Sequence, residues 1–137
     1  MKPVFADTLY WIGVAIPTDQ WHEPSTSAKN ALGEVILVTT DEVLTEFLNS
    51  LSKTPELRRI ATRIVQGIMG NPNVKVVPQT RGGFLQALDR FAQRPDKQYS
   101  LVDCGSMNVI QAEGIQEVLT NDHHFEQEGF TILIRKE

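Results

Sequence analysis

Short apolar runs recur along the chain at intervals that suit buried strands. Each run is rich in β-branched side chains and is bounded by polar or turn-forming residues. Runs of this kind are typical of strands that are buried on both faces, as in a parallel sheet. The pattern predicts five strands: Pro3–Ala6, Val35–Val38, Val74–Val77, Val118–Thr120 and Thr131–Ile134.

Between these runs, apolar residues recur at the spacing of an amphipathic helix. In one helical segment, Thr39 and Glu42 stand in the register of a capping box. In another, the apolar residues nearly surround the helix, which predicts that it is buried. Four segments carry the periodicity clearly and two carry it weakly: Thr39–Lys53, Pro55–Met69, Thr80–Ala92 and Ser100–Glu113, then Leu9–Ile16 and Pro24–Leu32.

Strands that alternate with helices favour right-handed crossovers and a parallel sheet. We therefore predict one α/β domain over residues 1–137, a sandwich with a mainly parallel central sheet. In this architecture, ligands bind beyond the carboxyl ends of the strands.

Acidic residues follow those carboxyl ends. Asp7 comes directly after the first strand, and Asp122 follows the fourth. Asp103 lies in the first turn of the buried helix that leads to the fourth strand. The helix after the second strand carries three further acids: Asp41, Glu42 and Glu46. If the sheet is parallel, these side chains meet at one edge of the molecule.

Clustered carboxylates repel one another, and a divalent cation removes that penalty. Oxygen ligands with few histidines suit Mg²⁺ or Mn²⁺ better than Zn²⁺. A pair of such ions would activate water and stabilise the leaving oxygen in phosphodiester cleavage. That chemistry needs no side-chain nucleophile, so the single cysteine, Cys104, does not count against it.

Each acid also has a purely structural interpretation. Asp7 could cap the helix that follows it. Asp103 stands three residues after Ser100, which is the spacing of a capping box, and Asp122 could be a turn residue. Against this, Asp103 shares a helical face with two apolar residues, and an inward-facing acid needs a partner. In the helix after the second strand, periodicity favours Glu46 over Glu42 only slightly.

The remaining polar residues carry weaker signals. We expect His123 and His124 to be loop or surface residues near Phe125, although one of them could reach a metal or a phosphate. His22 is expected in a loop. Charges spaced four residues apart on a helix usually form a solvated face. We apply that interpretation to the arginines: Arg58, Arg59, Arg63, Arg90 and Arg94.

Taken in order, the acids and their neighbours resemble the PIN domain, and more narrowly the VapC-type toxins of bacterial toxin–antitoxin pairs. Four stretches carry the resemblance: residues 5–8, 39–46, 99–104 and 119–130. The resemblance implies a three-layer α/β/α sandwich with a mainly parallel central sheet, and a Mg²⁺- or Mn²⁺-dependent endoribonuclease. It also implies that the acids of the site are Asp7, Glu46, Asp103 and Asp122, with supporting hydroxyls at Thr8, Ser100 and Thr120.

The resemblance leaves some points open and extends to partners. Glu46 could be a ligand or the base that orients water, and the site could hold one metal or two. The implied partners are an RNA substrate, a cognate antitoxin and a second copy of the chain, and Trp11 and Trp21 are compatible with a dimer face. The alternative is a PIN-like module that binds RNA or protein without cutting. A haloacid-dehalogenase-type phosphatase is disfavoured, since position 9 is Leu.

Charge and composition change this picture little. The chain has 13 Lys+Arg against 17 Asp+Glu, a net charge of −4, and bulk charge therefore does not favour nucleic acid. The four site acids equal that deficit, so the acidic balance is better explained by a metal site, and RNA binding without metal should be poor. One cysteine fits a reducing compartment. The apolar run at residues 9–16 is too short to span a membrane, and we expect a cytoplasmic protein without a signal peptide.

Overall fold

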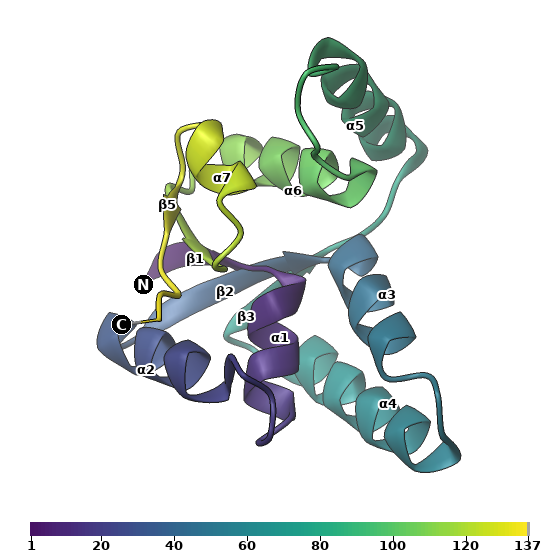
Figure 1. Cartoon of the computed structure of the whole chain (residues 1–137), viewed down its shortest axis with the longest axis vertical. Coiled ribbons are helices and arrows are strands. Elements are labelled where there is room, and N and C mark those ends of the chain that lie inside the picture. The colour runs from purple at the N-terminus through teal and green to yellow at the C-terminus, as the bar shows by residue number, and fades with distance from the viewer. Residues whose placement is uncertain (137) are drawn as a thin grey trace.

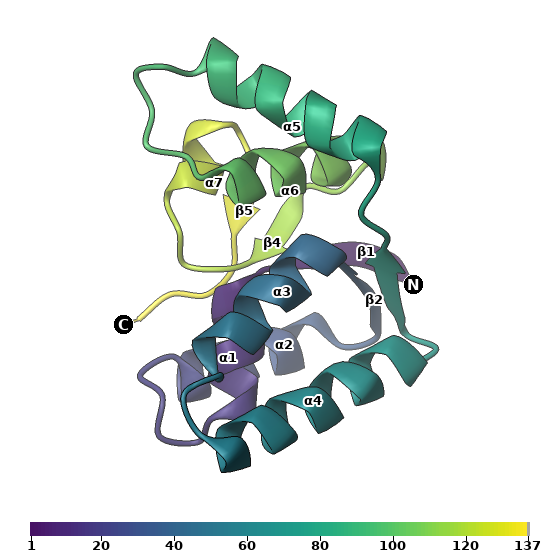
Figure 2. The same cartoon turned by 90° about the vertical axis from the view of Figure 1, so that its right-hand side faces the viewer.

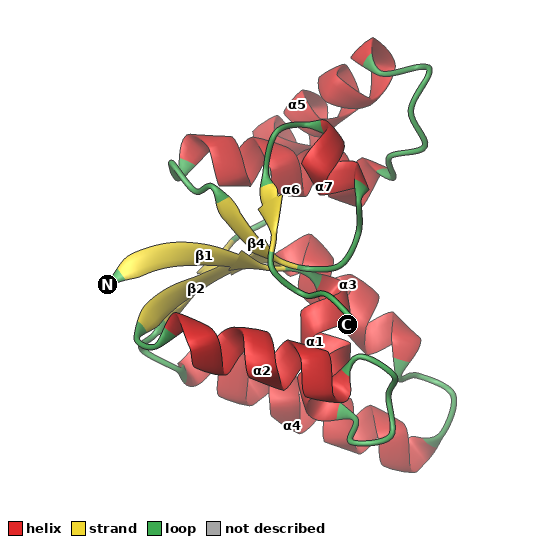
Figure 3. Cartoon of the chain, turned by 60° about the vertical axis from the view of Figure 1, so that its left-hand side comes forward, coloured by secondary structure: helices red, strands yellow, loops and turns green. Residues whose placement is uncertain are grey.

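The structure is a computed structural model that describes residues 1–136. Its centre is a single sheet of five strands in the order β3-β2-β1-β4-β5, and every neighbouring pair is parallel. The strands are β1 (Lys2–Ala6), β2 (Val35–Thr40), β3 (Val74–Val77), β4 (Glu117–Leu119) and β5 (Thr131–Ile132). All five predicted strands are present, and the predicted α/β fold with a parallel sheet is confirmed (Figures 1 and 3).

Helices cover the sheet on both sides, as the figures show. One side carries α1 (Thr8–Ala15), α2 (His22–Leu32), α3 (Asp41–Ser50) and α4 (Pro55–Gly70). The other side carries α6 (Leu101–Ala112) and the short α7 (His124–Gln127), and α5 (Arg81–Gln93) packs on the outside of α6 (Figure 2). This arrangement is the predicted three-layer sandwich.

The core lies where the central strands meet the inner helices. Val4, Phe5 and Ala6 of β1 are fully buried, as is Phe47 of α3 on one side and Met107 of α6 on the other. A strand buried on both faces needs an unbroken apolar run, which is why the pattern of the sequence located β1. Because β1 is the middle strand, the residue after it emerges at the centre of the sheet's carboxyl edge.

Two local predictions on the α1–α4 side are wrong. Strand β2 continues through Thr40, so Thr40 rather than Thr39 caps α3, and its hydroxyl accepts a hydrogen bond from the Val43 amide. Thr39 instead donates to the Ala6 carbonyl, across to β1. His22 is the first residue of α2 rather than a loop residue, and its Nδ1 lies 2.8 Å from the Gly13 carbonyl oxygen.

The predicted apolar face of α5 exists, but it faces solvent. Four side chains that form this apolar stripe are each 37–48% exposed: Phe84, Leu85, Leu88 and Phe91. The opposite face of α5, with Ala87 and Arg90, packs on α6. The two tryptophans do not form an exposed face. Trp11 is buried and donates to the Thr39 hydroxyl, and the ammonium group of Lys136 lies over the Trp21 ring.

Arg90 is also not on the solvated face that its spacing predicted. Only 9% of it is exposed, and its guanidinium donates to the side chains of Asn108, Gln111 and Glu128. Glu128 accepts further hydrogen bonds from Arg94 and from the Tyr99 hydroxyl. This network joins α5 to α6 and to the segment after α7. The spacing of the arginines is typical of a surface, but here their side chains connect three parts of the fold.

Within residues 1–136, no helix has both the length and the apolar character that crossing a membrane requires.

Candidate active site

Asp7 lies at the centre of the carboxyl edge of the sheet, directly after β1. It occupies the N-cap position of α1, but its side chain makes no capping hydrogen bond. The carboxylate accepts a hydrogen bond of 3.0 Å from the Thr120 hydroxyl instead, and Asp7 is only 7% exposed. The capping interpretation therefore accounts for the position of Asp7 but not for the direction of its carboxylate.

Burial raises the pKa of Asp7 from 3.8 to about 7. The negative charges of Asp103 and Glu46 push this pKa in the same direction, while hydrogen bonds from the Thr8 amide and the Thr120 hydroxyl oppose it. These contributions show that Asp7, Glu46 and Asp103, which come from three different elements, share one electrostatic environment.

Glu46 reaches this edge from the second turn of α3. Its Oε1 accepts a hydrogen bond of 2.6 Å from the Thr8 hydroxyl at the start of α1. Thr8 therefore holds the carboxylate of Glu46 beside Asp7, as Thr120 holds Asp7 beside β4. The two other acids of α3 point elsewhere: Asp41 accepts from the Gln79 amide, and Glu42 faces Gly105 of α6.

Asp103 is both a helix-capping residue and a member of the cluster. Ser100 and Asp103 form the capping box that their spacing allows: the Ser100 hydroxyl accepts from the Asp103 amide, and Asp103 accepts from the Ser100 amide. Burial raises the pKa of Asp103 and the charge of Asp122 adds to the effect, whereas the Ser100 amide and His124 act against it. The structural role thus fixes the orientation of the carboxylate without excluding a functional one.

Asp122 and His124 complete the cluster next to Asp103. Asp122 accepts from the His124 amide, which is the turn role anticipated for it, and Thr120 accepts from the Asp122 amide. The His124 Nδ1 lies 3.3 Å from a carboxylate oxygen of Asp122 and 3.5 Å from one of Asp103. One ligand atom from each of these three residues lies within 4.8 Å of the other two.

The expectation of a surface position holds for His123, whose side chain is 64% exposed and pairs with Glu126. It is wrong for His124, whose ring packs edge-on against Tyr99 at 5.2 Å between centroids. Tyr99 in turn donates to Glu128 of the network that includes Arg90. The order Asp122-His123-His124 could have predicted this position of His124, because a turn at Asp122 directs the residue two positions later back toward the carboxylate.

The structure therefore places all four predicted acids at one edge, in two linked groups. Asp7 and Glu46 are held by hydroxyls of Thr8 and Thr120, and Asp103 and Asp122 lie with His124. Ser100 forms the cap of α6 and thereby orients the carboxylate of Asp103.

The donor set of this cluster fits a hard divalent cation. Among residues 1–136, no Lys or Arg forms an ion pair with any of the four acids. The His124 Nδ1 is buried and lacks a hydrogen bond of good geometry. Carboxylates with an adjacent, unsatisfied imidazole nitrogen offer oxygen and nitrogen ligands whose mutual repulsion a cation would relieve.

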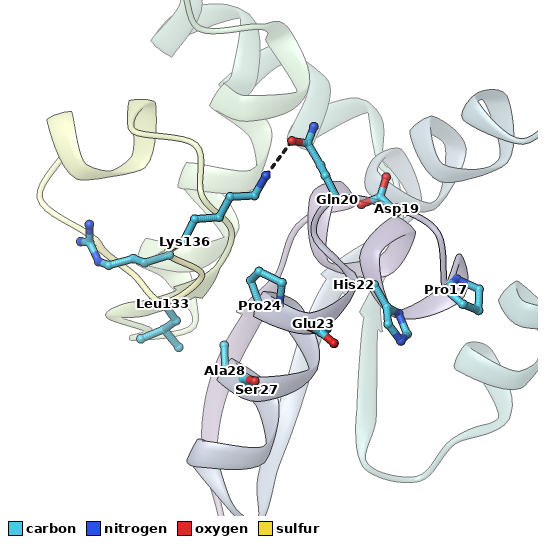
Figure 4. Close-up of a pocket in the computed structure, with 11 residues that line it drawn as sticks. Pro17, Asp19, Gln20, His22, Glu23, Pro24, Ser27, Ala28, Leu133 and Lys136 are labelled. Carbon is cyan, nitrogen blue, oxygen red and sulfur yellow. Dashed lines mark hydrogen bonds between the residues drawn. The ribbon is translucent and has the colours of Figure 1, made fainter.

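A separate cavity of about 890 Å³ lies between the α1–α2 connection, α2 and the C-terminal segment (Figure 4). None of the four acids lines it. Three of its charged groups have partners: Asp19 accepts from the Trp21 amide, Lys136 donates to Gln20 and Arg135 donates to Glu126. The last two contacts fasten the C-terminal segment to the α1–α2 connection and to α7.

A solved structure has the same fold as this chain. The chain superimposes on the crystal structure of VapC20 of Mycobacterium tuberculosis, a toxin that cleaves the sarcin–ricin loop, with a TM-score of 0.83 and 24% identity. The match covers 93% of this chain and 96% of the toxin. This likeness confirms the PIN-like fold. No protein-family model and no curated protein sequence matches the chain.

Proposed function

We propose that this protein is a metal-dependent endoribonuclease that acts as the toxin of a type II toxin–antitoxin pair. The observation that carries the proposal is the cluster of Asp7, Glu46, Asp103 and Asp122 at the carboxyl edge of a PIN-like sheet, with no Lys or Arg of the described chain paired to it. The likeness to a toxin that cleaves the sarcin–ricin loop supports RNA as the substrate.

The residues that would hold the cation are Asp103, Asp122 and His124, with Asp7 alongside. Mg²⁺ or Mn²⁺ suits this set because most of its ligands are carboxylate oxygens. When bound, the cation would lower the pKa of a water molecule and offset the negative charge that develops on the phosphate. The number of bound ions, one or two, depends on whether Glu46 is also a metal ligand.

Asp7 and Glu46 lie at the same edge, beside this ligand group. Burial raises the pKa of Asp7 to about 7 in the metal-free chain, and a bound cation would lower that pKa, so that Asp7 would take part as a carboxylate. The hydroxyl of Thr8 fixes one oxygen of Glu46 and leaves the other to orient a water molecule. The proposed ligand group is therefore Asp103, Asp122 and His124, with Asp7 and Glu46 beside it.

The net charge of −4 bears on how RNA would bind. Four uncompensated acids at the site repel phosphate, so we expect weak RNA binding until a divalent cation neutralises them. We also propose a cytoplasmic location, an antitoxin that covers the acidic edge, and a homodimer formed through the apolar stripe of α5.

The test is cleavage of a structured RNA by the purified protein with Mg²⁺, Mn²⁺ or EDTA. We expect cleavage only with a divalent cation, and a loss of at least about 100-fold in Asp7→Asn. Asp89→Asn, on the exposed face of α5, is the matched control and should cleave normally. Cleavage that persists in Asp7→Asn would contradict the proposal. RNA binding without any cleavage would instead favour the non-catalytic PIN-like module.

A further inference from the structure

A second cavity, of about 380 Å³, lies where α3, α5 and α6 meet. Figure 2 shows the three helices stacked on this side of the molecule, with the β3–α5 connection beside them. Its walls include the apolar side chains of Val77, Pro78 and Val109 and the glycines Gly83 and Gly105. None of the four acids of the cluster lines this cavity.

Glu42 lines this cavity, and one of its two carboxylate oxygens is unpaired. This oxygen, Oε1, is buried and has no hydrogen-bond partner among residues 1–136. A Cβ atom at Gly105 would lie 4.0 Å from Oε2 and 3.7 Å from the Ala87 Cβ, so the missing side chain at Gly105 keeps the space in front of the carboxylate open. A buried acceptor without a donor is costly, and a ligand with N–H groups would remove that cost.

Asn108 adds a complementary donor. Its Oδ1 accepts a hydrogen bond of 2.8 Å from Nε of Arg90. Since a guanidinium can only donate, this contact fixes the amide orientation and directs Nδ2 away from Arg90. The Nδ2 group is buried and has no partner in the part of the chain that the structure describes, and Asn108 lines the same cavity as Glu42.

The ligand must therefore donate to a carboxylate, accept from an amide and have a flat or apolar body. An arginine or lysine side chain from a protein partner would satisfy Glu42 but leave Asn108 without an acceptor. A nucleobase has both kinds of group. Among the four bases, guanine alone has two adjacent N–H donors, N1–H and the N2 amino group, next to an acceptor, O6, on its Watson–Crick edge.

The cavity adjoins the acid cluster along two elements. Glu42 precedes Glu46 by one turn of α3, and Gly105 follows Asp103 by two residues in α6. We propose that this cavity receives an unstacked guanine base of the RNA, with Glu42 accepting from N1–H and the N2 amino group and Asn108 donating to O6. The inference rests on the proposed ribonuclease function and specifies a base that its substrate must contain near the cleaved bond.

The test measures binding of nucleoside 5′-monophosphates to the whole protein in EDTA, so that no metal can bind the phosphate. We expect GMP to bind at least about tenfold more tightly than AMP, CMP or UMP and to shift the amide resonances of Gly83 and Gly105. Inosine 5′-monophosphate, which lacks the N2 amino group, should bind with intermediate affinity.

Two variants separate recognition from folding. Glu42→Gln replaces one acceptor by a donor and should remove the preference for GMP. Gly105→Ala places a methyl group at ordinary contact distance and should block GMP while the protein stays folded. Glu56→Gln, an exposed glutamate at the start of α4, is the matched control and should bind GMP normally.

Equal affinity for all four nucleotides, or GMP binding that survives both variants, would overturn the inference. This outcome is distinct from failure of the proposed function. Metal-dependent RNA cleavage without a guanine preference would refute the guanine site alone, while GMP binding without RNA cleavage would refute the nuclease alone.

Discussion

Asp7 has conflicting roles in stability and in chemistry. The fold buries its carboxyl group beside two other acids, which raises its pKa from 3.8 to about 7. Between these two pH values the folded chain holds a proton that the unfolded chain has released. The free energy of unfolding therefore falls as the pH rises through this window, and the full penalty is present above pH 7.

We predict that Asp7→Asn stabilises the fold at high pH. The shift from 3.8 to about 7 corresponds to an order-of-magnitude penalty of about 4 kcal/mol above pH 7. The gain in stability should therefore be several kcal/mol at pH 8 and should shrink toward zero as the pH approaches 4. Urea unfolding in EDTA at both pH values measures this, with Asp89→Asn as the control. If the variant is less stable than the wild type at pH 8, burial of the ionised Asp7 carboxylate does not destabilise the fold.

His124 offers a second test at the same scale. Its Nδ1 lies beside both Asp103 and Asp122, whereas the neighbouring His123 points to Glu126 at the surface. We predict that His124→Ala weakens Mn²⁺ binding about tenfold and that His123→Ala leaves it unchanged. Isothermal titration calorimetry measures the affinity independently of any cleavage. Equal affinities in the two variants would remove His124 from the ligand set.

At the scale of elements, the contact between α5 and α6 depends on one buried charge network. The Arg90 and Glu128 side chains are each 10% exposed and meet at 2.7 Å. Burial raises the pKa of Glu128, but hydrogen bonds from Arg94 and Tyr99 and the nearby arginine charges outweigh it, so the pKa is lowered. Because Arg90 also fixes Asn108, and Tyr99 packs on His124, the network supports both candidate binding sites.

Removing Arg90 should therefore be far more costly than removing a surface cation. We predict that Arg90→Met lowers the free energy of unfolding by about 3 kcal/mol, because it leaves the buried Glu128 with fewer partners. Lys75→Met breaks a comparable contact with Glu113, in which the lysine side chain is 57% exposed, and should change stability by less than about 1 kcal/mol. Urea unfolding of both variants gives the comparison, and equal losses would contradict the prediction.

For the molecule as a whole, the apolar stripe of α5 is the surface feature that the fold of one chain does not account for. Phe84, Leu85, Leu88 and Phe91 lie together on the outside of a helix whose other face is already packed. Exposed apolar patches of this kind are typical of interfaces.

We predict that Leu88→Glu converts a dimer to a monomer, because it places a charge in the middle of this stripe. Met69→Glu on α4, where the methionine is 63% exposed, is the matched control and should leave the dimer intact. Light scattering coupled to size-exclusion chromatography measures the mass. A wild-type protein that is monomeric at high micromolar concentration would assign the stripe to another partner.

Local patterns located the elements well. The apolar runs of β1 to β5 and the periodicity of six helices are properties of neighbouring residues, and burial in a sandwich enforces them. The shared carboxyl edge of parallel strands predicted that Asp7 and Asp122 lie close together, whereas the choice of Glu46 over Glu42 came only from the resemblance to PIN domains. The short helix α7 was not anticipated, because four residues carry too little periodicity to distinguish a helix from a turn.

Local sequence patterns establish the strand–helix alternation, the parallel sheet and the order of the acids along it. Which face of each element is buried depends on the tertiary structure. It buried Arg90, turned the apolar stripe of α5 to solvent, brought His124 to Asp103, and left Glu42 facing an open cavity. Periodicity within an element shows that the element has an apolar face. Which other element packs against that face depends on contacts between residues far apart in the chain.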